Sequence, residues 1–290
     1  MSRETILVVG ATGMLGEPVA RRLSVAGYAV RVLTRRPEPA RGKFGSEFEI
    51  MQGDVEDPAS LEAALADCDG VHVSLDGGAD PDLERRGTTN VAQAAAKLGV
   101  ARLTYLSGAS VFEENAWFAG TRARFQAEAA IRASGVPYTI FNATWFMESL
   151  PRFVHGGRGL VIGRQPHPAH WVAAEDFARM VARAYSSEDA VNKRLFIYGP
   201  EAYTLREALT IYCRIAYPGA RIITLPIWLA RIIARLGKRE ALQAALPFLT
   251  YHQKAHEGGD PAEANALLGA PTTTLAAWSQ QQAERSAAEA

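Results

Sequence analysis

Short apolar runs alternate with longer stretches of helical periodicity across the first half of the chain. The expected strands, rich in Val, Ile and Leu, are Thr5–Val9, Ala29–Leu33, Phe48–Met51, Gly70–Ser74, Arg102–Leu106 and Tyr138–Phe141. The expected helices between them are Met14–Ala26, Pro58–Ala66, Asp82–Leu98 and Thr121–Ala133. Consecutive strands joined through a helix run parallel, and the helices then cover both faces of the sheet. The sequence therefore predicts an α/β fold with a doubly wound parallel sheet.

The pattern changes after about residue 150. The segments that stand out there are a glycine-rich turn at Gly156–Gly159, a loop at Arg164–Pro168, an amphipathic helix at Glu175–Tyr185 and further helices at Trp228–Leu236 and Glu240–Tyr251. A strand near 194–198 is expected to return to the main sheet. We expect a first domain over residues 1–150 and a smaller, helix-rich C-terminal region over residues 151–290.

The composition is that of a folded globular protein. Hydrophobic residues make up 48% of the 290 residues and charged residues 21%, which excludes wholesale disorder. The 31 Lys and Arg residues balance the 31 Asp and Glu residues, and this zero formal charge argues against a nucleic-acid partner. Cys68 and Cys213 are too few for a disulfide framework, and no Cys/His cluster has the spacing of a metal site, so no metal is expected.

The sequence predicts neither export nor insertion into a membrane. The apolar run Ile222–Leu236 is interrupted by two arginines and is too short to cross a bilayer. The first expected strand begins at Thr5, which leaves no room for a signal peptide. We expect a soluble, cytoplasmic protein without a transmembrane segment, as a monomer or a homodimer.

A glycine-rich turn, Gly10–Gly16 (GATGMLG), follows the first expected strand and opens the first expected helix. Gly10 permits the tight turn, Gly13 lets the backbone approach a pyrophosphate, and Gly16 allows close packing of helix on strand. The N–H groups at the start of the helix then bind the phosphates, with Thr12, Met14 and Leu15 lining the same turn. This placement after a strand and before a helix predicts a Rossmann-like fold and a bound dinucleotide, NAD or NADP.

Arginines stand at the end of the second expected strand, where the side chains discriminate between NAD and NADP. NAD sites place an acid there for the ribose 2′-hydroxyl, whereas Arg35 and Arg36 favour the 2′-phosphate of NADP, and NADPH over NADH. The alternative is a solvated basic turn. Asp54 suits either the adenine amino group or the N-cap of the helix that begins near Pro58. Further cofactor contacts are expected from Val55, Ser74 and Leu75.

The sequence resembles the atypical short-chain dehydrogenase/reductase superfamily in the stretches ILVVGATGMLG, VLTRRPE, QGDVEDPASL, NVAQAAAKLGVARLTYLSGASV and SGVPYTIFNATWFMES. Within that superfamily it is similar to the NmrA-like, NAD(P)-binding branch and to quinone-reductase-type and isoflavone-reductase-type proteins. The resemblance implies that residues 1–150 bind NAD(P) and that residues 151–290 form a substrate or lid region. It specifies the fold and the cofactor and leaves the substrate open.

The resemblance also implies a Ser or Thr after the fifth strand and a Tyr-x-x-x-Lys pair on the next helix. Ser107 stands at the first position, with a turn or helix cap as its alternative role. The pair is missing, because Gly120 and Arg124 occupy its two positions. Arg124 can bind the nicotinamide ribose but does not titrate near neutrality, and its alternative is a solvated helix face. Gly108, Asn142, Ala143 and Thr144 complete the expected cofactor contacts.

Aromatic side chains gather in the segments expected to connect the sheet with its helices. We expect a substrate wall made by Phe112, Trp117, Trp145, Phe146 and Trp171, with core packing as the alternative. Such a wall suits a small, apolar, quinone-like, aromatic or polycyclic substrate. His155, His167 and His170 lie in neighbouring loops and could supply a proton, although each is more typical of a surface or structural residue.

The segment Trp228–Arg239 carries Trp228, Leu229, Ile232, Ile233 and Leu236 on one face and Arg231, Arg235, Lys238 and Arg239 elsewhere. Ordinary packing on the sheet domain is the favoured interpretation, followed by a lid over the pocket and then by contact with a membrane surface.

The functional hypothesis is an NADP(H)-dependent oxidoreductase without the Tyr-x-x-x-Lys pair. Two alternatives remain: a redox-sensing regulator that binds NAD(P) without turnover and acts through a protein partner, or a non-redox scaffold or assembly protein.

Overall fold

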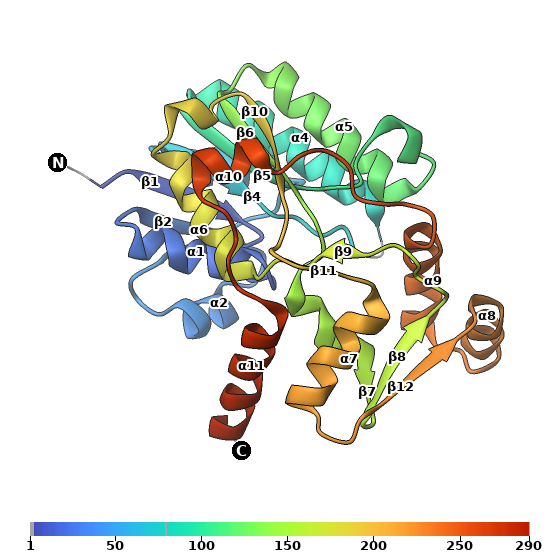
Figure 1. Cartoon of the computed structure of the whole chain (residues 1–290). Helices are drawn as coiled ribbons and strands as arrows, with labels where there is room; N and C mark the ends of the chain where they lie inside the picture. Colours follow the sequence, from blue (N-terminus) through green and yellow to red (C-terminus); the bar gives the residue numbers. More distant parts are fainter. Residues whose placement is uncertain (1–2, 79, 290) are drawn as a thin grey trace. The chain divides into compact units, whose positions relative to one another are not determined.

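A parallel sheet forms the centre of the first of two compact units in the computed structural model, which describes residues 3–78 and 80–289. The described residues of this sheet form seven strands in the order β10-β6-β5-β4-β1-β2-β3 (Figure 1). Their bounds are β1 Thr5–Val9, β2 Ala29–Thr34, β3 Glu49–Gln52, β4 Gly70–Val73, β5 Arg102–Gly108, β6 Tyr138–Ala143 and β10 Lys193–Ile197. Neighbouring strands are parallel throughout, which confirms the predicted doubly wound α/β fold.

Helices cover both faces of this sheet. Their bounds are α1 Gly16–Val25, α2 Pro37–Phe44, α3 Pro58–Leu65, α4 Pro81–Leu98, α5 Ala119–Ser134, α6 Ala174–Tyr185 and α10 Ala262–Leu268. Helix α3 packs on α4 and α4 on α5, whereas α1 packs on α6. The strands β1, β4 and β5 bury Leu7, Val71 and Leu103 in one continuous core with α3, α4 and α5.

The first unit is not continuous in sequence. It contains the described residues up to Ala143, then Ala174–Ile197 and Asp260–Gly269. Strand β10 pairs with β6, as expected for the strand near 194–198. Helices α6 and α10 also pack in this unit, although they lie beyond residue 150. The assignment of residues 1–150 and 151–290 to separate functions stays a prediction.

The second unit comprises Thr144–Ala173, Tyr198–Gly259 and the described part of 270–290. It contains a three-stranded sheet of described residues in the order β12-β8-β7, and a short pair, β9 with β11. The strand bounds are β7 Val154–His155, β8 Arg158–Ile162, β9 Ala169–His170, β11 Ala202–Tyr203 and β12 Arg221–Leu225. The helices are α7 Leu205–Ala216, α8 Ile227–Leu236, α9 Glu240–His252 and α11 Leu275–Glu289.

Helix α2 and strand β12 are among the elements that differ from the sequence prediction. Helix α2 was not expected, although Pro37 at its first position is a common start signal. Strand β12 lies in a region predicted to be mostly helical. Pro226 follows it directly and disfavours helix in the preceding residue, and β12 then pairs with β8 in parallel.

No helix within residues 3–78 or 80–289 has the length and apolar character needed to cross a membrane.

Candidate cofactor-binding and active site

The glycine turn sits where β1 ends and α1 begins, and two of its glycines are sterically required. Gly10 has φ +85°, and a Cβ there would lie 2.1 Å from the Ser74 carbonyl oxygen. A Cβ at Gly16 would lie 2.2 Å from the Gly10 carbonyl oxygen. Both distances are far below van der Waals contact, so the turn can pass β4 and α1 can approach the turn only with glycine at these positions.

Packing within the fold does not require glycine at position 13, whereas the approach of a bound pyrophosphate would. Its N–H donates to the Gly10 carbonyl oxygen at 3.0 Å, and a Cβ would meet only that oxygen, at 3.2 Å. Thr12 and Gly13 are exposed, Met14 and Leu15 are half-buried, and no side chain caps α1. No described side chain satisfies the first N–H groups of α1, although the Glu17 N–H donates to the Gly13 carbonyl oxygen at 3.2 Å. An exposed turn before a helix without a side-chain cap is the arrangement that a pyrophosphate needs.

Lys43 of α2 adds a positive charge beside this turn, and the sequence analysis missed it. Its Nζ donates to the Thr12 carbonyl oxygen at 3.2 Å and forms an ion pair with Glu17. Burial opposes ionisation of Glu17, but hydrogen bonds from Lys43 and Arg21 outweigh it and lower the pKa of the carboxyl. Recognising Pro37 as a helix start could have revealed that α2 brings Lys43 back to the turn.

The side chains of Arg35 and Arg36 are exposed at the end of β2. Among the described residues, neither guanidinium forms an ion pair or a side-chain hydrogen bond. Arg36 is the N-cap residue of α2 and bonds Thr34 through its backbone only. Both side chains are therefore available to a phosphate without the loss of an existing contact, which is the condition that a 2′-phosphate site requires.

Asp54 is not the N-cap of α3, which corrects one of its two expected roles. Asp57 caps this helix by accepting from the Ala59 N–H at 3.1 Å. Asp54 instead accepts from the Glu56 N–H at 3.0 Å through Oδ1, in the turn after β3. Val55 is buried, and a Cβ added to Gly87 of α4 would lie 2.7 Å from its Cγ2.

Ser74 and Leu75 follow β4 and are half-buried. The Ser74 N–H donates to the Val9 carbonyl oxygen at 3.0 Å, which continues the pairing of β4 with β1 beyond its last residue. This bond holds Ser74 next to Gly10, at the carboxyl edge where parallel sheets bind ligands.

Ser107 ends neither a helix nor a turn, which corrects its alternative role as a cap. Its Oγ donates to Glu128 Oε1 at 2.6 Å, and Ser107 is 4% exposed. Glu128 of α5 also accepts from Asn142 Nδ2 at 2.9 Å and from Arg132 at 3.3 Å. The hydroxyl proton of Ser107 is therefore already used inside the fold. A catalytic role for Ser107 stays a prediction.

Arg124 is held by a buried carboxylate, so it is a paired rather than a free helix-face arginine, although 38% of its own side chain is exposed. Its Nε lies 3.0 and 3.1 Å from the two carboxylate oxygens of Glu84 in α4. Tyr105 donates its hydroxyl to the same carboxylate at 2.8 Å. The charge of Glu84 raises the pKa of Arg124 above its already high ordinary value, against the effect of burial. Arg124 is thus a fixed, permanently charged donor.

The guanidinium of Arg124 lies beside the ends of β5 and β6. A Cβ added to Gly108 would lie 3.7 Å from Arg124 Nη1. Gly108 pairs with Ala143, and Asn142 Nδ2 donates to the Gly108 carbonyl oxygen at 3.0 Å. Asn142 Oδ1 is buried and has no hydrogen-bond partner within the described parts of the chain. Thr144 follows Ala143, the last residue of β6, and begins the second unit.

The aromatic residues predicted as a substrate wall do not share one environment. Trp171 is 1% exposed and donates its indole N–H to the Tyr203 carbonyl oxygen, and Phe146 is 8% exposed. Both belong to the buried part of the second unit, because its strands and helices close around them. Trp145 is half-buried, with its ring 5.3 Å from that of Trp171 and 4.7 Å from that of His252.

The remaining two aromatic residues belong to the first unit. Trp117 is 54% exposed. The ring of Phe112 stacks on that of Phe196 with centroids 6.1 Å apart, and the Arg194 guanidinium carbon lies 4.9 and 5.1 Å from the two centroids. A role in substrate binding stays a prediction for Phe112, Trp117 and Trp145.

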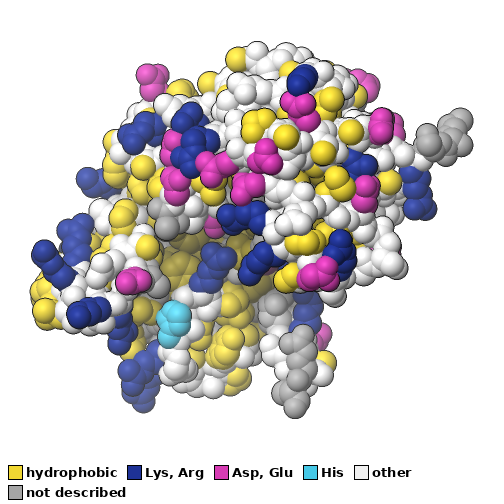
Figure 2. Space-filling view, turned by 180° about the vertical axis from the view of Figure 1, so that it is seen from behind, with side chains coloured by type: hydrophobic (Ala, Val, Ile, Leu, Met, Phe, Trp, Pro, Cys, Tyr) yellow, Lys and Arg dark blue, Asp and Glu magenta, His cyan; other side chains and the backbone are white. Residues whose placement is uncertain are grey.

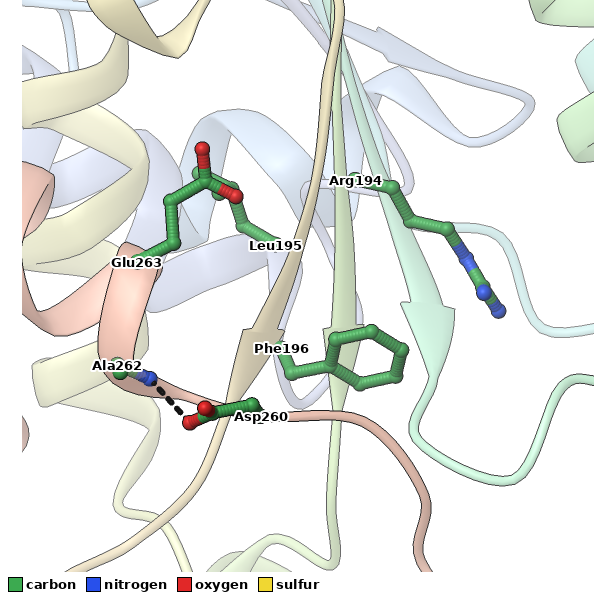
Figure 3. A pocket seen from close by; sticks show the side chains of 6 residues that line it. All are labelled: Arg194, Leu195, Phe196, Asp260, Ala262 and Glu263. Carbon is green, nitrogen blue, oxygen red and sulfur yellow. Dashed lines mark hydrogen bonds between the residues drawn. The ribbon is translucent and has the colours of Figure 1, made fainter.

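A pocket of about 410 Å³ lies in the first unit, at the edge strand β10 and the start of α10. Figure 3 shows Arg194 and Phe196 on one side of the strand and Leu195 on the other, with Asp260 accepting from the Ala262 N–H at 2.8 Å. Strands β6, β5 and β4 separate β10 from β1, and neighbouring strands are spaced about 4.8 Å apart. This pocket is therefore distinct from the glycine turn.

The three histidines expected in loops belong to the second unit. His155 and His167 are exposed. His170 forms a hydrogen bond between its Nδ1 and Glu257 at 2.7 Å and stacks on Tyr198 at 4.7 Å between ring centroids. Burial raises the pKa of Glu257, although hydrogen bonds from His170 oppose it. His170 is thus a paired residue rather than an isolated surface histidine.

The glycine turn, the uncapped start of α1 and the cations around them define a dinucleotide-binding α/β protein. The chain belongs to the NAD(P)H-binding family of atypical short-chain dehydrogenase/reductase-like proteins, whose sequence pattern matches residues 10–188. This confirms the resemblance at the level of the family.

One relative is similar in sequence over the whole chain, and two solved structures are similar in fold. The (4-alkanoyl-5-oxo-2,5-dihydrofuran-3-yl)methyl phosphate reductase of Streptomyces griseus is 33% identical over 290 residues, which cover 98% of this chain and 100% of that protein. The structure is also similar to triphenylmethane reductase of Citrobacter sp. complexed with NADP(H), at TM-score 0.78, 21% identity and coverage of 96% and 99%. The NADPH-dependent quinone oxidoreductase of Escherichia coli complexed with NADPH has TM-score 0.73, 22% identity and coverage of 95% and 99%. These two structures share the fold.

Proposed function

We propose that the protein is an NADPH-dependent reductase of small, largely apolar molecules whose reducible bond is conjugated to a carbonyl. The observation that carries this proposal is the replacement of a titrating tyrosine and lysine by Gly120 and by Arg124, which Glu84 holds in its charged form. Such a reductase has a cation in a fixed position, Arg124, but has no tyrosine hydroxyl at position 120 that could donate a proton. It suits acceptors that need little acid assistance.

The residues around the glycine turn fit NADPH. Gly13 leaves the space that a pyrophosphate needs, and the start of α1 offers its N–H groups. Arg35 and Arg36 would bind the 2′-phosphate, and Arg124 would donate to the nicotinamide ribose. When bound, NADPH supplies a hydride. The task of this chain is to bind, orient and surround the cofactor with positive charge.

The demand for a proton differs between acceptors. A quinone that accepts a hydride becomes a stabilised hydroquinone anion, which solvent can protonate afterwards. A simple ketone becomes a far more basic alkoxide and needs an acid in the transition state, a contribution of about 10²- to 10⁴-fold. Without an acid at position 120, the conjugated acceptor is favoured.

Names of relatives support this substrate class. The Streptomyces griseus relative is named for a dihydrofuran ring that carries an oxo group, an alkanoyl group and a methyl phosphate, so its ring fits the conjugated class while its phosphate is charged. The Escherichia coli protein is named for quinones and the Citrobacter protein for triphenylmethane dyes. The oxo-dihydrofuran and the quinones have a conjugated carbonyl group, whereas triphenylmethane compounds have none. A cytoplasmic location and a monomeric or homodimeric state remain part of the proposal.

Substrate-dependent oxidation of NADPH, followed by its absorbance, tests the proposal. We expect turnover with menadione or an unsaturated furanone and a rate about 10²- to 10⁴-fold lower with cyclohexanone. Arg124→Ala should raise the KM for NADPH without introducing a new ionisation into the pH profile. Arg124→Lys is the matched control and should retain most of the affinity for NADPH.

Robust reduction of cyclohexanone, controlled by an ionisation near neutrality, would overturn this proposal and implicate one of the histidines. Tight binding of both oxidised and reduced cofactor with no turnover of any acceptor would favour the regulator or scaffold instead.

A further inference from the structure

Helix α8 presents a line of large apolar side chains to solvent. Trp228 is 63% exposed, Ile232 45% and Leu236 81%. Residues four positions apart lie on one face of a helix, so the three side chains form a single ridge. Most of the large exposed hydrophobic residues elsewhere in the described chain are isolated, which is normal for a soluble protein. A continuous ridge of this kind marks an interaction surface.

The opposite face of α8 already fixes the helix to its own unit. Ala230 and Ala234 are fully buried there and belong to a core cluster with Ile162 of β8 and Leu246 and Leu249 of α9. These small alanines allow close packing of the helix. The ridge of Trp228, Ile232 and Leu236 is therefore not part of the core of the second unit.

Cations flank the ridge, and acids are absent from the segment. Residues 221–239 contain Arg221, Arg231, Arg235, Lys238 and Arg239 and neither Asp nor Glu, in a chain whose formal charge is zero. Arg231 and Arg235 stand three residues after Trp228 and Ile232 and therefore lie beside them on the helix. Among the described residues, these two arginines and Lys238 form no ion pair. Figure 2 shows dark blue and yellow side chains together at the left edge of the view, with a magenta acidic side chain close by.

We propose that α8 binds the surface of a membrane that contains anionic lipids. The apolar ridge would enter the boundary between headgroups and acyl chains, and Arg231 and Arg235 would reach the lipid phosphates while their stems cover apolar surface. Trp228 suits this boundary, since its ring is apolar and its N–H is polar. This proposal does not rest on the proposed reductase function.

The helix is built to lie on a bilayer and not to cross it. Its ten residues span about 15 Å at 1.5 Å per residue, half of the hydrocarbon thickness. Two arginines within those ten residues also oppose full insertion. The positive excess favours a negatively charged surface over a neutral one, because each cation near an anionic leaflet strengthens binding.

Co-sedimentation of the full chain with vesicles tests the proposal. We expect binding to vesicles of equimolar phosphatidylglycerol and phosphatidylcholine, little binding to phosphatidylcholine alone, and loss of binding as salt is added. Tryptophan emission should shift to shorter wavelength on the anionic vesicles. That shift should be largely absent in the Trp228→Phe variant, although the chain contains five tryptophans.

Variants separate the contribution of the apolar ridge to vesicle binding from the contribution of the arginines. Leu236→Ser should weaken vesicle binding about tenfold or more, and Arg231→Gln or Arg235→Gln about fivefold each. Leu98→Ser and Arg214→Gln are the matched controls, because both residues are exposed but lie on other helices, and neither should change binding. All five variants change exposed side chains, so circular dichroism should remain that of the parent.

Four results would overturn the proposal. Equal binding to neutral and anionic vesicles, or equal loss in the control variants, would remove the role of α8. Absence of vesicle binding together with a dimer that Leu236→Ser dissociates in analytical ultracentrifugation would assign the ridge to a second copy of the chain. Absence of vesicle binding together with a loss of NADPH turnover in Leu236→Ser would assign α8 to a lid.

Discussion

At the scale of single residues, Arg35 and Arg36 decide the expected cofactor preference. We predict that NADPH binds more tightly than NADH by roughly ten- to a hundredfold, because hydrogen bonds to a charged group contribute about 1.5–3 kcal/mol. Replacement of both by alanine should equalise the two affinities, mainly by weakening NADPH. Calorimetric titration of both cofactors measures this difference directly.

Arg41→Ala provides the control for that experiment. Arg41 is an exposed arginine of α2 that already pairs with Glu38 in the preceding turn, so its removal should leave the preference unchanged. Equal affinities in the parent protein, or a preference that survives the double replacement, would exclude Arg35 and Arg36 as the 2′-phosphate site.

The burial of His72 in β4 should make the stability of the folded protein depend on pH. The side chain is fully buried, its Nδ1 lies 2.8 Å from Thr104 Oγ1, and burial lowers its pKa from 6.5 to about 3. The unfolded chain therefore binds a proton more readily than the folded one. Stability is complete above pH 6.5 and falls by about 1.4 kcal/mol per pH unit as the pH drops from 6.5 towards 3.

Urea unfolding at neutral pH and at about pH 5 should show a loss of about 2 kcal/mol from this residue. In His72→Leu that part of the acid dependence should vanish, while Thr104 keeps its bond with the Tyr185 hydroxyl at 3.0 Å. If the variant loses stability with acid as steeply as the parent does, the neutral histidine is not the cause.

At the scale of elements, the start of α7 is fixed by a capping box. The Thr204 hydroxyl accepts from the Glu207 N–H at 3.3 Å, and the Glu207 carboxylate accepts from the Thr204 N–H at 2.9 Å. Thr204→Ala should lower the free energy of unfolding by about 1 kcal/mol, because the Glu207 N–H loses its acceptor. Thr210→Ala, in the same helix, should change it by less than about 0.5 kcal/mol. If urea unfolding shows similar losses of unfolding free energy in both variants, the capping box does not contribute more to stability than an ordinary helix residue.

The elements also differ in how far the sequence predicted them. The periodicity of α8 was evident, but which face would be buried was not. An amphipathic pattern usually turns its large apolar side chains inward, whereas here Ala230 and Ala234 face the core and Trp228, Ile232 and Leu236 face solvent. Packing against α9 decides this, and the partner of a helix cannot be read from the helix itself.

At the scale of the whole molecule, the cofactor should stabilise the fold. A ligand that binds only the folded state adds about 2.7 kcal/mol at a concentration one hundred times its Kd. We predict this gain for NADPH in the parent and its absence in Gly13→Val, because a side chain there occupies the space of the pyrophosphate. Thermal unfolding with and without NADPH measures both.

Gly42→Ala is the matched control for Gly13→Val. A Cβ at Gly42 in α2 would meet nothing within 4 Å, so this variant should keep the full gain from NADPH. Circular dichroism of Gly13→Val should match the parent, since a Cβ there meets only the Gly10 carbonyl oxygen. A variant that still gains stability from NADPH would place the nucleotide elsewhere.

The sequence by itself determined the alternating sheet and helices, the glycine turn and the family, because these depend on local periodicity and on residues that are neighbours in the chain. Only the tertiary structure decided which distant residues meet. Arg124 became a fixed cation because α4 brings Glu84 to it across 40 positions, and the Ser107 hydroxyl donates its hydrogen bond to Glu128 on α5. The inclusion of α6 and α10 in the first unit was decided in the same way. Such contacts follow from the burial of side chains between elements, and burial is a property of the assembled fold.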